Sequence, residues 1–181
     1  MIETPRLILR RWQLDDAEDM YEYAKNPNVG PNAGWKPHES VEESREIIKK
    51  FLEGNEWAIV DKDTNKVIGS LGVMKDYKRP IETAFSIGYV LSEDYWGKGL
   101  MTEIVKAIIP YVFEDLKAES LSVGHFSFND KSRRVIEKCG FTYEGTYRRA
   151  YPVYSGEIYD ELNYSMLKEE YEALKKEGFF K

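Results

Sequence analysis

The stretch from Thr83 to Phe113 places the strongest constraint on how this 181-residue chain can fold. It begins with an apolar, aromatic-rich segment, Ala84 to Leu91, which predicts a strand. It then crosses Gly97-Lys98-Gly99 into a segment whose apolar residues recur every three or four positions, which predicts a helix with one apolar face. The first N–H groups of a helix lack partners within the helix, and the helix dipole is positive at that end. A strand that enters a helix through small residues is therefore suited to binding an anion.

Two common phosphate-binding motifs do not fit this stretch. A P-loop requires Lys and then Ser or Thr after its second glycine, whereas Gly99 is followed by Leu100. The dinucleotide fingerprint requires a small residue three positions after the second glycine, and that position holds Thr102. A nucleotide-binding α/β protein stays open as an alternative, and it predicts affinity for ATP or NAD.

Composition excludes several classes of protein. A hydrophobic share of 42% with 32% charged residues is typical of a folded domain. The net charge of −6 argues against nucleic acid as a partner, since a nucleic-acid backbone requires a basic surface. No signal segment or apolar run of membrane length is present, so we expect a cytoplasmic protein without a membrane partner. Two histidines and one cysteine without paired spacing predict no metal site.

The remaining chain alternates recognisable elements. A strand is predicted at Arg6 to Gln13, helices at 15–25 and 40–54, and an antiparallel hairpin at 56–60 and 66–77. After the central strand and helix come a strand at 121–128, a short helix at 129–139, strands at 141–150 and 157–166, and a terminal helix at 167–176. The strand-helix-strand order predicts a right-handed parallel crossover.

Local signals mark where the helices begin and end. Asp15 is expected to cap the first helix, and Ser40 with Glu43 forms a capping box for the second. Asn129 is expected to be the N-cap of the short helix, which Gly140 would end in the left-handed conformation. Pro110, late in the central helix, is positioned to introduce a kink.

Two motifs resemble a known superfamily. Trp96-Gly97-Lys98-Gly99-Leu100-Met101 lies over the pyrophosphate loop [R/Q]-x-x-G-x-[G/A] of the GNAT superfamily, the acyl-coenzyme A dependent N-acyltransferases. Here Trp96 replaces Arg or Gln and Met101 replaces the last small residue. The segment NDKSRRVIEKCGF, from Asn129 to Phe141, is similar to the superfamily pattern N-x-x-[SA]-x-x-x-x-x-K-x-G-F.

The opening TPRLILR and the segment GYVLSEDYWGKGLMTE resemble the branch that acetylates ribosomal-protein N-termini. The resemblance covers nearly the whole chain. It implies a single N-acetyltransferase domain over residues 1–181 of the α/β (α+β) class. The central sheet would be mixed and mostly antiparallel, with about seven strands, helices on both faces and a βαβ crossover at the cofactor loop.

The resemblance also implies acetyl-CoA as cosubstrate. The backbone from Gly97 to Thr102 would bind the pyrophosphate, and the end of the central strand would pair with the pantetheine arm. The residues implied in cofactor binding are Val90, Leu91, Trp96, Gly97, Lys98, Gly99, Leu100, Met101, Thr102, Asn129 and Ser132.

The implied reaction is direct attack of a primary amine on the acetyl thioester in a ternary complex. It requires a base for the amine and an acid for the leaving thiolate. Glu82 and His125 are the candidate bases, although a solvated turn residue and a structural histidine are alternative interpretations of them. Ser132 is the candidate contact for the thiolate, because the tyrosine that some family members use is replaced by Ile136. Cys139 is interpreted as a packing residue.

The acceptor is expected between two loops that carry Trp35, Tyr151 and Tyr154, although a packed Trp35 is an equally good interpretation. The resemblance favours a protein N-terminal α-amine, such as that of a ribosomal protein. Aromatic residues with scattered acids equally suit a polyamine, an aminoglycoside or an amino acid. A coenzyme A binding module that has lost catalysis is a further alternative. Homodimers are frequent in this branch.

Overall fold

The computed structural model describes residues 1–180. The strands are β1 (Ile2–Glu3), β2 (Leu7–Arg11), β3 (Glu56–Asp61), β4 (Val67–Lys75), β5 (Ala84–Leu91), β6 (Ser120–Phe126), β7 (Thr142–Pro152) and β8 (Ile158–Leu167). The helices are α1 (Ala17–Ala24), α2 (Val41–Glu53), α3 (Leu100–Pro110), α4 (Asp130–Lys138) and α5 (Lys168–Lys176). Short 3₁₀ turns lie at η1 (Leu14–Asp16), η2 (Gly30–Ala33) and η3 (Glu93–Tyr95), and a π-helical turn, η4 (Tyr111–Asp115), follows α3.

Across the described residues the eight strands form one sheet in the order β1-β2-β3-β4-β5-β6-β8-β7. β2 with β3, β3 with β4 and β6 with β8 pair antiparallel, whereas β5 and β6 pair parallel. The mixed, mostly antiparallel sheet is therefore confirmed, and so is the parallel crossover through α3. The sheet exceeds the predicted seven strands because two residues of β1 pair with β2.

The chain divides into two compact units. The first consists of residues 1–72, 89–100 and 152–158, and the second of residues 73–88 and 101–151 and the chain from 159 onward. Strands β4 and β5 each contribute residues to both units. The single domain over residues 1–181 stays a prediction.

The core of the first unit forms beneath α1 and α2. Trp12, Met20, Ile48 and Val60 are nearly inaccessible to solvent and pack together. Ser40 caps α2 as predicted, because its hydroxyl accepts a hydrogen bond from the Glu43 N–H at 3.1 Å. The apolar stripes read from the sequence therefore become the faces that these helices bury.

The predicted cap of the first helix is wrong. A 3₁₀ turn precedes α1 and shifts the helix start, so Asp16 and not Asp15 is at the N-cap position. The Asp16 carboxylate accepts a bond from the Gln13 N–H at 2.8 Å and two bonds from the Arg10 guanidinium, at 2.7 and 2.8 Å. The pairing raises the pKa of Arg10, chiefly through the hydrogen bond to Asp16.

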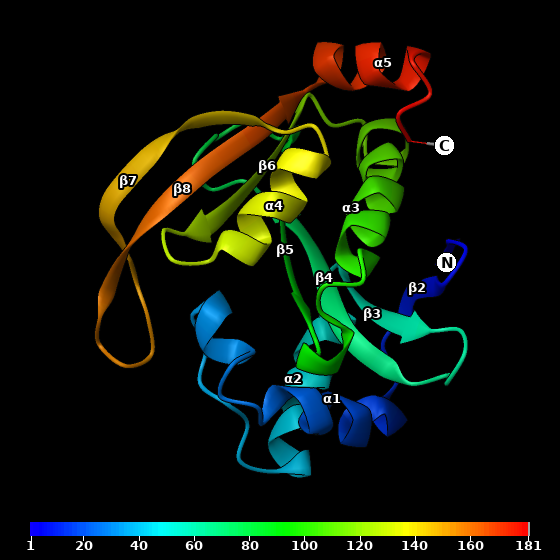
Figure 1. The fold of residues 1–181 in the computed structure, drawn as a ribbon, viewed down its shortest axis with the longest axis vertical. Coiled ribbons are helices and arrows are strands. Elements are labelled where there is room, and N and C mark those ends of the chain that lie inside the picture. The colour runs from blue at the N-terminus through cyan, green and yellow to red at the C-terminus, as the bar shows by residue number, and fades with distance from the viewer. Residues whose placement is uncertain (181) are drawn as a thin grey trace. The chain divides into compact units, whose positions relative to one another are not determined.

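In the second unit, α3 continues into the π-helical turn after Pro110, which lacks the N–H that a regular helix needs. Phe113 in this turn stacks on Tyr171 of α5, with ring centroids 4.6 Å apart. Figure 1 shows α4 lying along β6, and contacts join the two elements. Asn129 caps α4 and Gly140 follows it at φ +84°, as predicted.

A buried carboxylate fixes the connection between β4 and β5 in the second unit. Asp76 is 4% exposed and accepts bonds from the Ser122 hydroxyl at 2.8 Å, the Lys78 N–H at 2.9 Å and the Arg79 guanidinium at 3.0 Å. Burial alone would raise the pKa of Asp76, but these bonds outweigh burial and hold the pKa below its ordinary value. Arg79 also pairs with Glu144, which accepts a bond from the Ser165 hydroxyl.

Among residues 1–180, no helix is both long enough and apolar enough to cross a lipid bilayer. The cytoplasmic location stays a prediction.

Replacing Asp76 with Asn tests this network. The substitution should lower the free energy of unfolding by about 1–3 kcal/mol near neutral pH, because buried donors lose a charged acceptor. Since folding lowers the pKa of Asp76, its stabilising effect is complete above the unfolded pKa of about 4 and is lost as pH falls through the folded pKa. Denaturant titrations of both proteins between pH 7 and pH 2 should therefore converge in acid. A gap that stays constant across this range would contradict the charge argument.

Cys139 should be inert to thiol reagents. It is fully buried, and burial raises the pKa of its thiol to about 12. At pH 8 the native protein should react with an aromatic disulfide reagent roughly a thousandfold more slowly than the unfolded chain, because only the thiolate attacks. Comparing the reaction rate with and without denaturant measures this ratio.

Candidate active site

The loop from Trp96 to Gly99 has a backbone conformation suited to an anion. Gly97 has φ +75° and Gly99 has φ +76°, whereas Lys98 between them has a negative φ. An alternation of negative and positive φ is typical of an anion-binding nest, in which successive N–H groups turn toward one side. α3 begins immediately afterwards at Leu100, so its unpaired N–H groups and its dipole add to the same site. That this loop binds a pyrophosphate stays a prediction.

The two glycines are required by their backbone angles and not by crowding. A methyl group added at Gly97 would meet no other heavy atom within 4 Å, and one added at Gly99 would first meet Arg6 Nη2 at 3.8 Å. Left-handed φ values cost ordinary residues about 1–2 kcal/mol, so glycine is favoured at both positions. The space around the loop is open to a ligand.

Trp96 fastens this loop to the strand before it. Its indole N–H donates to the Leu91 carbonyl at 2.8 Å. The residue that replaces the family's Arg or Gln therefore acts on the chain itself, through a hydrogen bond that closes the turn. Met101 is buried at 7% exposure, so the bulk of the second replacement is in the core and does not cover the loop.

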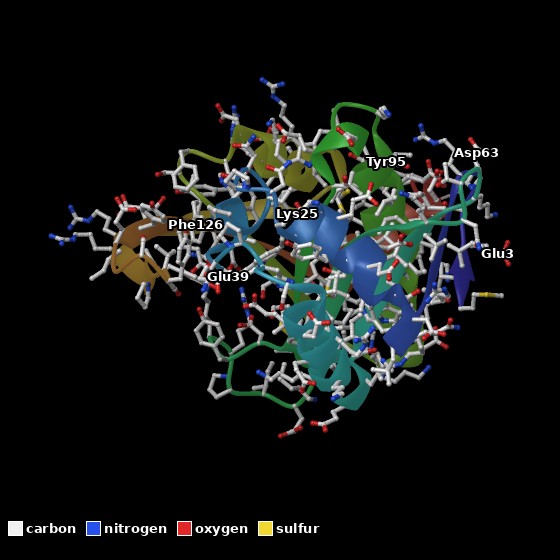
Figure 2. The ribbon with its side chains drawn as sticks, turned by 90° about the horizontal axis from the view of Figure 1, so that it is seen from below. Glu3, Lys25, Glu39, Asp63, Tyr95 and Phe126 are labelled. Atoms are coloured by element: carbon white, nitrogen blue, oxygen red, sulfur yellow. The ribbon has the colours of Figure 1, made fainter. Side chains whose placement is uncertain are left out.

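Arg6 is a residue of this site that the sequence reasoning missed. Its Nη1 donates to the Lys98 carbonyl at 3.0 Å, which ties the start of β2 to the loop. No local pattern in the opening TPRLILR indicates this contact, because the two residues are 92 positions apart in the chain. Arg6, Lys66 and Lys98 also line a neighbouring cavity of about 470 Å³. Figure 2 labels two other residues of its lining, Asp63 and Tyr95.

The two edges of β5 can be assigned from hydrogen bonds. The Ser92 N–H donates to the Ile68 carbonyl at 2.7 Å, so even-numbered residues direct their backbone toward β4. The Thr83 carbonyl accepts from the Glu119 N–H at 2.9 Å, so odd-numbered residues direct theirs to the opposite edge. Of the two residues predicted to pair with the pantetheine arm, Leu91 is on that opposite edge, whereas Val90 faces β4.

The parallel pairing of β5 and β6 is short. In the second unit it runs from Ala84 with Ser120 to Ser86 with Ser122, although β6 continues to Phe126. On its other side β6 stays paired with β8 as far as Phe126. Among the described residues, the pairing of β6 with β5 therefore ends at Ser122, and this edge of β6 is open beyond it.

Asn129 and Ser132 lie together at the start of α4. The Asn129 Oδ1 accepts a hydrogen bond from the Ser132 N–H at 3.1 Å, which confirms the N-cap. Ser132 is thereby placed in the first helical turn, where the dipole favours a developing negative charge. Their roles toward the cofactor stay predictions.

The two candidate bases have very different surroundings. His125 is 5% exposed; its Nδ1 donates to the Phe126 carbonyl at 2.8 Å, and its Nε2 is 3.4 Å from the Tyr164 hydroxyl. The Glu82 side chain is 97% exposed and is 3.4 Å from the Lys75 ammonium. Buried hydrogen bonds hold His125 in one orientation, whereas Glu82 lies in solvent.

The three aromatic residues predicted to line the acceptor site have different surroundings. Trp35 packs against the core of the first unit and over Gly30, as in the alternative interpretation. Tyr154 is 52% exposed on the β7–β8 connection. Tyr151 contacts Phe126, labelled in Figure 2, with ring centroids 5.0 Å apart. Burial raises the pKa of Tyr151, and the nearby Glu161 raises it further.

Among the described residues, no three His, Cys, Asp or Glu side chains gather in an arrangement that would hold a metal ion. The loop, the helix start and α4 supply N–H groups and hydroxyls, which are donors suited to a pyrophosphate and a thiolate.

Known proteins are similar to this chain in sequence and in fold. The model of the acetyltransferase (GNAT) domain matches residues 6–142. "Uncharacterized N-acetyltransferase YoaA" of Bacillus subtilis is 30% identical over 177 residues, covering 93% of this chain and 97% of its own length. "Uncharacterized N-acetyltransferase p20" of Bacillus licheniformis is 32% identical over 175 residues, covering 93% and 96%. "Putative ribosomal N-acetyltransferase YdaF" of Bacillus subtilis is 37% identical over 89 residues, covering 49% and 48%.

Solved structures are also similar to this chain in fold. A GNAT-family acetyltransferase from Bacillus anthracis superposes with a TM-score of 0.84 at 26% identity, covering 93% of this chain and 98% of its own. The ribosomal-protein-S5-alanine acetyltransferase of Vibrio fischeri has a TM-score of 0.76 at 23% identity, covering 92% and 95%, and shares the fold. So does the microcin C7 self-immunity acetyltransferase MccE, solved with acetyl-CoA and AMP, with a TM-score of 0.78 at 22% identity, covering 91% and 93%. The motifs, the fold and the relatives lead to one conclusion: this chain belongs to the GNAT family of acetyltransferases.

Proposed function

We propose that this protein transfers an acetyl group from acetyl-CoA to a primary amine, with a protein N-terminal α-amine as the leading acceptor class. The carrying observation is the nest of Gly97, Lys98 and Gly99 at the start of α3, which suits the pyrophosphate of coenzyme A. Acetyl transfer to an amine is the general reaction of the family. The finer choice of acceptor rests on the branch resemblance and on the name of the relative YdaF.

The loop backbone from Gly97 to Thr102 would hold the pyrophosphate, and the Leu91 edge of β5 would align the pantetheine arm. Bound acetyl-CoA supplies an activated acyl group. The chain's own residues orient that group and manage the protons: a base must receive the amine proton, and a donor must stabilise the leaving thiolate. Ser132 serves as that donor in this proposal, because its hydroxyl is at the positive end of α4.

His125 and Glu82 stay the candidate bases. The hydrogen bonds of His125 leave Nε2 as an acceptor that Tyr164 can reach, which would relay a proton between the two side chains. A small amine such as a polyamine or an amino acid is the second candidate acceptor class, because the exposed aromatic residues suit any compact cation. A homodimer also stays a prediction.

A Gly99→Glu variant tests the loop. The new carboxylate should repel the pyrophosphate and the left-handed φ should strain the loop, so calorimetric affinity for acetyl-CoA should fall at least a hundredfold. Gly156→Glu is the matched control, because Gly156 also has a left-handed φ, +88°, with no heavy atom within 4 Å of an added methyl group. Equal loss in both variants, or tighter binding of ATP than of acetyl-CoA by the native protein, would contradict the proposal.

A Ser132→Ala variant tests thiolate stabilisation. Loss of a general acid typically costs about 10²–10⁴ in rate, so kcat should fall by that order while KM for acetyl-CoA changes less than threefold. Ser127→Ala, an exposed serine before α4, is the control. Steady-state assays that release free coenzyme A measure both constants. An unchanged kcat would remove Ser132 from the mechanism.

A further inference from the structure

A lysine of the second unit lies in a cage of groups that recognise ammonium ions. The Nζ of Lys78 is 2.7 Å from the Glu161 carboxylate, and it donates to the Asn163 side-chain carbonyl. The same Nζ lies over the rings of Tyr77 and Tyr147, 5.3 and 5.4 Å from their centroids. A carboxylate, an amide oxygen and tyrosine faces are the usual partners of an alkylammonium.

The acidic side of this cage is built into the sheet. Glu161 and Asn163 are neighbours on one face of β8, with side-chain exposure of 12% for Glu161 and whole-residue exposure of 7% for Asn163. Gly124, opposite Asn163 on β6, makes room for the carboxylate, because an added methyl group there would be 2.7 Å from Glu161 Oε1. A side chain at position 124 would therefore displace Glu161.

The cage is close to the place where β5 and β6 part. Their described pairing ends at Ser122, and Gly124 is two residues further along β6 on the same face. In this fold the acyl thioester is expected beside that edge. A cation held at Glu161 would thus be next to the reaction centre on one face of the sheet.

The same face continues into an apolar surface. Phe126 is paired with Glu161, and the rings of Phe126, Phe128 and Tyr159 contact one another with centroids 5.0 to 5.6 Å apart. Phe128 is half exposed. A ligand with an ammonium group and an aromatic or apolar body would match the cage and this surface together.

Lys78 is held in a way that lets its side chain leave. Its N–H donates to Asp76, and its neighbour Arg79 pairs with Asp76 and Glu144, so the loop backbone is anchored without the Lys78 ammonium. Removing that ammonium alone would leave a buried carboxylate uncompensated, which is costly. Exchanging it for another ammonium keeps the charge balanced.

We propose that Glu161 and Asn163 form the ammonium-binding subsite for the acceptor, and that Lys78 occupies it until an acceptor arrives. This inference rests on the proposed function and specifies its acceptor as a primary ammonium attached to an aromatic or apolar body. Lys78 acts as a competing internal cation. The native protein therefore binds acceptors more weakly than it would if Lys78 did not occupy the subsite.

The test is calorimetric titration with 2-phenylethylammonium, without acetyl-CoA, and with 2-phenylethanol as the uncharged counterpart. Lys78→Ala should bind the ammonium at least tenfold more tightly than the native protein and should not gain affinity for the alcohol. Adding Glu161→Gln to Lys78→Ala should abolish the gain. In turnover, Lys78→Ala should lower KM for the same amine at least tenfold while KM for acetyl-CoA stays within twofold.

Lys75→Ala is the matched control, because Lys75 also contacts a carboxylate and a ring, Glu82 and Phe85, but is largely exposed. Lys78→Met, which keeps the apolar stem, replaces Lys78→Ala if circular dichroism shows that the alanine variant does not fold. The inference is overturned if the Lys78 variant gains no affinity, if the alcohol gains equally, or if the gain survives Glu161→Gln. A failure of acetyl-CoA binding would overturn the proposed function, whereas the titration without acetyl-CoA would still decide this inference.

Discussion

The left-handed backbone at Gly97 and Gly99 is the constraint on which the geometry of the proposed cofactor loop depends. It reverses the chain between β5 and α3 within a few residues and gathers N–H groups at the positive end of the helix. The surrounding contacts preserve that conformation: the Trp96 indole holds the loop to Leu91, and Arg6 holds it to β2. Apolar packing of α3 then fixes the direction of the helix, because Ile104 and Ile108 are fully buried.

The second unit adds a different constraint, which is the need to satisfy buried charges. Asp76, Arg79 and Glu144 form one chain of ion pairs, and Lys78 and Glu161 form another beside it. The first satisfies its members and holds the β4–β5 connection. The second balances a single carboxylate with the ammonium of one lysine side chain. In our interpretation, this difference makes the chain of Asp76, Arg79 and Glu144 structural. It makes the pair of Lys78 and Glu161 a binding site.

Local signals in the sequence accounted for much of the fold. The apolar periodicity located α2, α3 and the hairpin, and Ser40 and Asn129 capped the helices that their positions indicated. Asp15 is not the cap, because the 3₁₀ turn of η1 precedes α1 and moves the start of the helix to Ala17. No pattern in the sequence distinguishes this turn from the first turn of an α-helix. β1 was missed because two residues are too few for alternation to be detected. The loop before α3 could be predicted because its two glycines are only two positions apart in the chain, and its role in cofactor binding stays a prediction. By contrast, Arg6 with Lys98 and Lys78 with Glu161 join residues 92 and 83 positions apart, which no local pattern reveals.

The contact between Arg6 and the Lys98 carbonyl has a consequence for the order of folding. Closing a segment of that length costs chain entropy before any contact compensates for it. The loop is therefore expected to reach its final geometry only after β2 has joined the sheet, whatever the helical propensity of α3. A nascent chain that has already made α3 would still lack a competent anion site until its first strand docks. Recovery of cosubstrate affinity during refolding would then report the completion of the first unit, and not the earlier appearance of helix.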